Sequence, residues 1–172
     1  EHAVLDLSDL FRASLAKPNA LSTWRDELAL AKQYLSIEQY RLGKRLQVVW
    51  NIENVPNDLP IPHLTVQPLL ENAVIYGIQP SIQGGCIEIN ATYLQGVLKL
   101  QVSNPFMHSD TSSNPRGTRL ALNNIEARLK VLFGSTARLT IQQQLDRYTT
   151  SLSYPCSRPS TEAPKQDEDL NR

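Results

Sequence analysis

The sequence predicts an α+β fold, a two-layer sandwich in which helices cover one face of a mostly antiparallel sheet. Apolar residues recur at helical spacing in several stretches, and they alternate with period two in paired stretches separated by turn residues. In chain order this reads as helix, helix, strand, helix, hairpin, loop, helix and hairpin. Helices that carry one apolar stripe must bury it against the sheet, which makes two layers.

The composition is that of a folded protein: the chain has 172 residues, 41% hydrophobic and 20% charged, enough for a sizeable core. The 17 basic residues balance the 17 acidic ones, so no broad surface for nucleic acid or an anionic membrane is expected. Cys86 and Cys156 lack metal-ligand spacing, and free thiols in a reducing compartment are the simplest interpretation. No apolar run approaches the roughly 20 residues of a membrane-spanning helix.

An apolar stripe through Leu7, Leu10 and Phe11 predicts a first helix within residues 1–20. Because the helical pattern is already under way at the first residues, we expect the chain to be part of a longer protein. This helix is either the remnant of a dimerisation hairpin or a helix that packs on its own domain. The periodicity favours neither.

A second helix is expected to begin at Ser22 or Thr23, either of which could cap it, and to end at Gly43. Asp26 and Glu27 lie in its first turn, where acidic side chains interact favourably with the helix dipole. The sequence therefore assigns both carboxylates to the start of their own helix.

The third helix, Gln67–Ile78, is the element around which the rest is organised. Pro68 is tolerated in its first turn, and the core-facing side is apolar. Glu71 and Asn72 fall on the opposite, open side. A carboxylate next to a carboxamide can hold a hydrated Mg²⁺, although two solvated polar residues on an amphipathic helix are the simpler alternative.

The remaining elements follow from alternation and turn chemistry. We expect residues 21–155 to form the domain and residues 156–172 to form a disordered tail, because that segment is too polar to bury an apolar face. Within the domain we expect a strand at 47–53, a loop at 54–62, hairpins at 86–103 and 137–154, a lid-like loop at 106–115 and a helix at 117–132.

Short boxes in these elements resemble those of a known family. Pro68-Leu-Leu-Glu-Asn-Ala73 resembles the N box of the ATP-binding (Bergerat) domain shared by sensor histidine kinases and gyrase-type ATPases. Tyr34-Leu-Ser-Ile-Glu-Gln-Tyr-Arg41 is similar to the segment that precedes this domain in LytS-type sensor kinases. Gly117-Thr-Arg-Leu-Ala-Leu-Asn-Asn-Ile-Glu-Ala-Arg-Leu129 resembles the glycine-rich box that opens the following helix.

The chain departs from the family pattern at several positions. Asn104 stands where an aspartate recognises adenine, and its oxygen can still accept from the adenine amine without the charge. Phe106 replaces the glycine of the same box. Arg119 and Ala121 replace two glycines of the later box; the arginine could contact a phosphate directly, or it could crowd the loop. Tyr76 occupies a place where histidine is common.

The resemblance implies a nucleotide site for ATP and Mg²⁺. Glu71 would polarise the attacking group or orient water, Asn72 would hold Mg²⁺ against the phosphates, and Asn104 would recognise adenine. The phosphate side would be lined by Tyr76, Gly117, Arg119 and Asn124.

The resemblance also implies a role for the parent protein. It would be a homodimeric, membrane-anchored sensor with this domain at the cytoplasmic face of the inner membrane, acting on a LytTR-class response regulator. The combination of boxes is most similar to the AlgZ/FimS type, which implies regulation of alginate biosynthesis. The substrate histidine is absent, so this chain should not phosphorylate itself. A signalling scaffold that has lost nucleotide binding is the alternative, and a phosphatase role also remains open.

Overall fold

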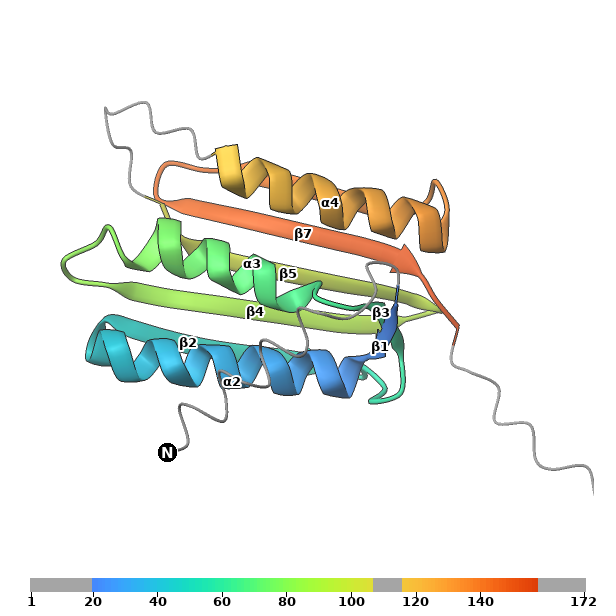
Figure 1. Ribbon diagram of the computed structural model, residues 1–172, viewed down its shortest axis with the longest axis horizontal. Coiled ribbons are helices and arrows are strands. Elements are labelled where there is room, and N and C mark those ends of the chain that lie inside the picture. The colour runs from blue at the N-terminus through green and yellow to red at the C-terminus, as the bar shows by residue number, and fades with distance from the viewer. Residues whose placement is uncertain (1–19, 107–115, 158–172) are drawn as a thin grey trace, which may run out of the picture.

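Figure 1 shows the computed structural model, which describes residues 20–106 and 116–157, with the backbone alone for residues 116–120. Three helices lie side by side on one face of a sheet, so the domain has two layers. The expected α+β sandwich is confirmed. The first helix, most of the lid-like loop and nearly all of the expected tail lie outside the described residues.

The helical layer consists of α2 (Trp24–Leu42), α3 (Val66–Ala73) and α4 (Arg116–Phe133). Thr23 caps α2, since its hydroxyl oxygen accepts a hydrogen bond from the backbone N–H of Asp26 at 3.2 Å. Gly43 ends α2 and Gly134 follows α4, both with positive φ. A single 3₁₀ turn, η1 (Gly43–Arg45), leads from α2 into the sheet.

The sheet has five strands in the order β2-β4-β5-β7-β6. The pairing of β2 with β4 is parallel, and the other pairs are antiparallel. Alternation places Ile87 and Ile89 of β4 and Leu100 of β5 under the helices, all of them buried. The strands are β2 (Leu46–Glu53), β4 (Gly85–Leu94), β5 (Val97–Pro105), β6 (Arg138–Gln143) and β7 (Arg147–Pro155).

A second, two-stranded sheet was not predicted. β1 (Leu21–Thr23) pairs antiparallel with β3 (Pro60–Pro62), inside the region expected to be a loop. Three-residue strands are too short to show period-two alternation, so this pairing carries no sequence signal. It fastens the start of α2 to the segment that leads into α3.

The organising helix also differs from a uniform α-helix. After Ala73 the chain continues as a π-helix, η2 (Val74–Ile78), in which the N–H of Gln79 donates to the carbonyl of Val74 at 2.9 Å. Arg45 donates from Nη2 to the carbonyls of Gln79 (3.0 Å) and Ser81 (2.6 Å), so a cation satisfies the acceptors beyond the end of η2. π-helical turns are uncommon and occur often at functional sites.

The packed part of the chain extends through Cys156, one residue into the segment expected to form the tail. Cys156 is buried, its N–H donates to the carbonyl of Gly96, and its carbonyl accepts from the Tyr93 hydroxyl at 2.9 Å. The burial of Cys156 raises the pKa of its thiol, as burial does for Cys86. Both cysteines are free.

Candidate nucleotide site

The three boxes meet at one end of the sandwich. η2 ends, β5 ends and α4 begins at the same side in Figure 1, because α3 and α4 run antiparallel across the sheet. The segments that carry Asn72 and Tyr76, Asn104, and Gly117 with Arg119 therefore lie at a common edge. Segments far apart in the sequence converge there, as a ligand site at the end of a sheet requires.

Asn104 is the most closely held residue of the candidate site. Its side chain is 4% exposed, and its Nδ2 donates to the carbonyl of Pro105 at 2.7 Å. Gly77 of η2 leaves room for it: a Cβ at Gly77 would lie 2.4 Å from Asn104 Nδ2. Because the amide nitrogen is engaged locally, Oδ1 is left as the acceptor for an exocyclic amine.

Asn72 presents a polar atom with no partner. Its Nδ2 is buried and makes no hydrogen bond to any described residue. It lies one turn beyond Pro68 on α3, on the side that faces α4. Buried polar groups are usually satisfied, so an orphan amide at this position is consistent with a ligand that completes it.

Glu71 is placed differently from Asn72. Its Oε1 accepts from Nε2 of Gln67 at 2.8 Å, one turn earlier on α3. It also lies close enough to Tyr34 of α2 to act on it: burial raises the pKa of the Tyr34 phenol, and the charges of Glu38 and Glu71 raise that pKa further. Glu71 therefore contacts Gln67 and acts on Tyr34, whereas the Nδ2 of Asn72 has no partner among the described residues.

A groove of about 500 Å³ runs between α3 and α4. Of the predicted residues that the structure describes with side chains, only Asn124 lines it. Asn72, Tyr76 and Asn104 lie beyond its lining. The groove is lined by Leu64, Pro68, Ala121, Asn124, Ile125 and Arg128.

The glycine-rich box lies in the first turns of α4. Gly117 and Arg119 belong to this helix by their backbone, and the side chain of Arg119 lies outside the described part of the chain. The start of a helix offers backbone N–H groups and a partial positive charge to an anion. The box is thus part of α4, which begins at Arg116.

Two aromatic residues beside Asn104 were not predicted as site residues. Phe106 stacks on Tyr148 with ring centroids 6.2 Å apart, and Tyr148 is the direct cross-strand partner of Asn104. The replacement of a box glycine by Phe106 was the available signal, but its partner on β7 could be found only from the strand register.

The oxygen atoms available at the candidate site decide whether it could bind Mg²⁺. Among the described residues, no group of three His, Cys, Asp or Glu side chains could hold a metal ion. Mg²⁺ commonly keeps several waters and takes one or two protein oxygens plus phosphate oxygens. The Oδ1 of Asn72 fits that requirement when nucleotide phosphates supply the rest, so the residues present fit a shared Mg²⁺–nucleotide complex and no isolated metal site.

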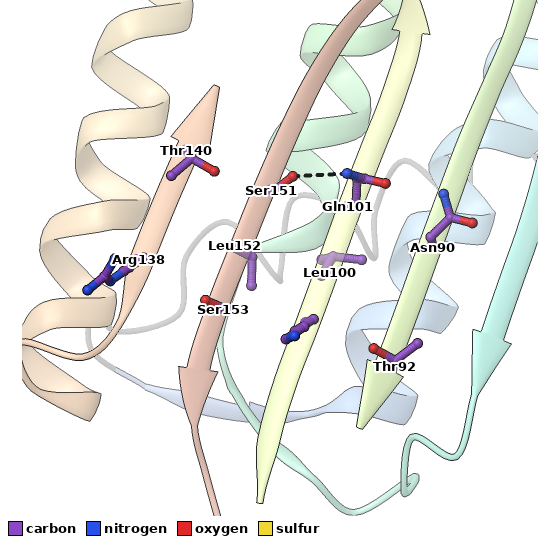
Figure 2. A pocket seen from close by; sticks show the side chains of 10 residues that line it. Asn90, Thr92, Leu100, Gln101, Arg138, Thr140, Ser151, Leu152 and Ser153 are labelled. Atoms are coloured by element: carbon purple, nitrogen blue, oxygen red, sulfur yellow. Dashed lines mark hydrogen bonds between the residues drawn. The ribbon is translucent and has the colours of Figure 1, made fainter. Parts of the chain in front are cut away.

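The face of the sheet that the helices leave uncovered carries a second, shallow hollow of about 340 Å³ (Figure 2). Its lining is mainly hydroxyl and amide side chains, with Gln101 Nε2 donating to Ser151 at 3.2 Å. Lys99 and Arg138 flank Ser153 in register across three strands. None of the predicted site residues lines this hollow, so it is separate from the candidate nucleotide site.

Known proteins resemble the chain over most of its length. The histidine kinase family matches residues 1–46. Sensor histidine kinase YesM of Bacillus subtilis is 28% identical over 156 residues, covering 89% of this chain and 27% of YesM. Sensor histidine kinase/phosphatase LytS of Staphylococcus aureus is 31% identical over 169 residues, covering 91% of this chain and 28% of LytS.

Solved structures share the fold. The catalytic domain of histidine kinase ThkA superposes with a TM-score of 0.58 at 10% identity, covering 79% of this chain and 94% of that domain. Full-length ShkA in complex with AMPPNP gives a TM-score of 0.59 at 13% identity, covering 91% of this chain and 36% of ShkA.

The described domain therefore has the fold of histidine kinase catalytic domains, and the chain is a relative of the sensor histidine kinases. It spans about a quarter of the length of the two curated relatives named above. None of the helices within the described ranges is long and apolar enough to cross a membrane.

Proposed function

We propose that this chain is the ATP-binding catalytic part of a two-component sensor histidine kinase. The observation that supports the proposal is that η2 ends, β5 ends and α4 begins at one end of the sandwich (Figure 1). The end of β5 carries Asn104, which packs against Gly77, and the preceding helix α3 carries Asn72, whose Nδ2 has no partner among the described residues. Sequence relatives that are sensor histidine kinases support it, as does a structural relative solved with AMPPNP.

Each residue of the site would contribute by binding and orientation. Asn104 Oδ1 would accept from the adenine amine, while Gly117, Arg119, Asn124 and Tyr76 would line the phosphate side. Glu71 would orient the attacking group, its carboxylate steadied by Gln67. Bound Mg²⁺, held in part by Asn72, would neutralise phosphate charge. Catalysis would then rest on positioning and electrostatic stabilisation.

The acceptor would be a histidine outside this chain, and the phosphoryl group would pass from there to a response regulator of the LytTR class. We further propose that the parent protein is a homodimeric membrane sensor with this domain at the cytoplasmic face. It would be a sensor of the AlgZ/FimS type, with control of alginate biosynthesis as its output.

The test is a calorimetric titration of the chain with a non-hydrolysable ATP analogue, with and without Mg²⁺. Saturable binding that needs the metal is the expected result, and it would justify adding back the upstream histidine segment to assay phosphoryl transfer. Absence of binding at millimolar nucleotide would contradict the proposal.

The alternative is a signalling scaffold of the same fold that docks a response regulator without nucleotide. One observation favours it: the start of the box, from Gly117 to Ala121, is already helical, where a glycine-rich phosphate loop would need an open backbone. The retained pair of Glu71 and Asn72 opposes it, because a scaffold has no need for an adjacent carboxylate and carboxamide at this position. The same titration separates the two.

A further inference from the structure

The N-terminal end of α3 is held by a side chain from another helix. Glu27 of α2 is 1% exposed, and its carboxylate accepts backbone N–H bonds from Leu64 (2.7 Å), Thr65 (2.9 Å) and Val66 (3.1 Å). These are among the donors that a helix start leaves without partners. Thr65, at the N-cap position, makes no side-chain cap bond, because its hydroxyl donates to the Pro62 carbonyl instead.

A second charged side chain reaches the same junction from the opposite flank. Arg128 of α4 donates from Nη1 to the carbonyl of His63 at 2.5 Å and from Nη2 to the carbonyl of Leu64 at 2.9 Å. Arg128 also lines the groove between α3 and α4, and its buried Nε has no hydrogen-bond partner within residues 20–106 and 116–157. The two helices that flank α3 therefore each bind the turn that starts it.

Leu64 shows how firmly this turn is held. It has φ of +54°, a left-handed conformation disfavoured for a residue with a side chain. Its N–H goes to Glu27 and its C=O goes to Arg128, so both polar groups of the strained residue are engaged. Strained backbone persists only where its surroundings over-determine it.

The turn is also hydrogen-bonded to the segment Ala20–Thr23, which leads into α2. β1 pairs with β3, and the N–H of His63 donates to the carbonyl of Ala20 at 2.9 Å. The N–H of Trp24 donates to the carbonyl of Leu59 at 2.8 Å. The backbone at Ala20–Trp24 is therefore hydrogen-bonded directly to the segment that runs into α3.

We propose that Glu27 and Arg128 are positioning residues that together hold the first turn of α3, an arrangement called the clamp below. We propose further that this clamp couples the segment Ala20–Thr23 to the candidate nucleotide site. Neither residue is required to touch nucleotide. By holding the start of α3 against both neighbours, the clamp sets where Asn72 lies relative to α4. The coupling to nucleotide rests on the proposed function, whereas the clamp itself does not.

Amide hydrogen exchange on the whole chain tests the clamp without nucleotide. Glu27→Gln keeps the shape of the side chain but removes its charge and replaces one acceptor oxygen by a donor group. Glu38→Gln, on the same helix and paired with Arg41, is the matched control. We expect exchange of the amides at 64–73 to accelerate about tenfold or more in Glu27→Gln, with the sheet protected as before and the control unchanged. Unchanged exchange at 64–73, or an equal loss across all elements, would overturn the clamp.

A second arm tests the coupling by its reciprocity. If nucleotide binding is linked to the segment Ala20–Thr23, the Mg²⁺–ATP analogue must slow amide exchange at residues 20–24 in the wild type. This slowing must be lost in Glu27→Gln. Binding of the analogue without any effect at residues 20–24 would overturn the coupling. A wild-type chain that binds no analogue would contradict the proposed function instead, and the clamp would still be decided by the first arm.

Arg128→Lys provides an independent check, because lysine keeps the charge but lacks the fork that binds both carbonyls. It should accelerate exchange of the same amides, and combining it with Glu27→Gln should add less than the sum of the two effects, since both act on one turn. Additive effects would show that the residues act separately and would overturn the clamp as a unit.

Discussion

The side chain of Asn104 occupies the space that a Cβ on Gly77 would fill. A Cβ at Gly77 would lie 2.4 Å from Nδ2 and 2.9 Å from Cβ and Cγ of Asn104. The contact joins the end of β5 to the π-helical turn that follows α3. It brings together residues from two separate boxes of the sequence, so Asn104 and the π-helical turn after α3 are positioned by one another.

Gly77→Ala should therefore destabilise the fold. The new methyl group must displace Asn104, and overpacking of this kind costs about 1–3 kcal/mol, although alanine recovers up to about 1 kcal/mol of helix propensity. Urea unfolding measures the loss in the free energy of unfolding. In an Asn104→Ala background the same substitution should cost clearly less, because the clash is removed. An equal cost in both backgrounds would contradict the contact.

Asn72→Ala should separate binding from stability. The substitution removes a buried amide nitrogen that has no partner, so the free energy of unfolding should change by less than about 1 kcal/mol. Mg²⁺-dependent binding of an ATP analogue should be abolished in calorimetric titration. Asn51→Ala, on the edge strand β2, loses a bond to Asn90 of β4; it serves as the matched control and should bind normally. Unchanged affinity in Asn72→Ala would remove this residue from the site.

Arg45→Met should destabilise the domain by about 1.5–3 kcal/mol, the usual range for hydrogen bonds that involve a charged group. The carbonyls of Gln79 and Ser81 would lose their donor while the aliphatic stem is kept. Arg41→Met is the comparison, since Arg41 is exposed and pairs only with Glu38 among the described residues, and such surface pairs contribute about 0–1 kcal/mol. Thermal and urea unfolding should rank the two variants in this order; a larger effect at Arg41 would contradict it.

Tyr154 should make stability fall in alkaline solution. Burial raises the pKa of its phenol, with a further rise from Cys156 and Glu27, and its hydroxyl donates to the Pro60 carbonyl at 3.1 Å. The unfolded chain then loses this proton first, near pH 10. The contribution of Tyr154 to the free energy of unfolding is therefore constant below about pH 10. Above that pH it declines, by at most about 1.4 kcal/mol per pH unit for each such tyrosine.

Unfolding measured from pH 8 to 11 checks this sign. Tyr154→Phe should be about 1 kcal/mol less stable at pH 8, because the bond to Pro60 is lost. It should nevertheless show a shallower decline above pH 10. Some decline should remain, since the pKa of Tyr34 is also raised by burial. Parallel curves for the two proteins would contradict the prediction.

Local patterns were sufficient for much of the architecture. Thr23, one of the two residues expected to cap α2, is its cap, Gly43 ends that helix, and the period-two stretches form hairpins. The layers followed from these elements because each apolar face has only the sheet to cover it. For the candidate site, the order of the boxes along the chain predicted that Asn72 and Asn104 serve one site, and this remains a prediction.

Other features depend on contacts between distant segments. The π-helical turn of η2 is accompanied by Arg45, which binds beyond its end, and by the packing of Gly77 on Asn104, neither of which leaves a local pattern. The aromatic neighbour of Asn104, Tyr148, required the register between β5 and β7. The pairing of β1 with β3 joins segments too short to alternate.

Glu27 shows most clearly the difference between what a local sequence pattern predicts and what tertiary contacts decide. The sequence by itself determined the helices, the strands and their apolar faces, because these depend on spacing within one segment. It also placed Glu27 in the first turn of α2, where an acidic side chain would serve its own helix. Only the tertiary structure decided that this carboxylate binds the start of α3, 37 to 39 residues further on, because the backbone donors of that turn are buried beside it and need an acceptor.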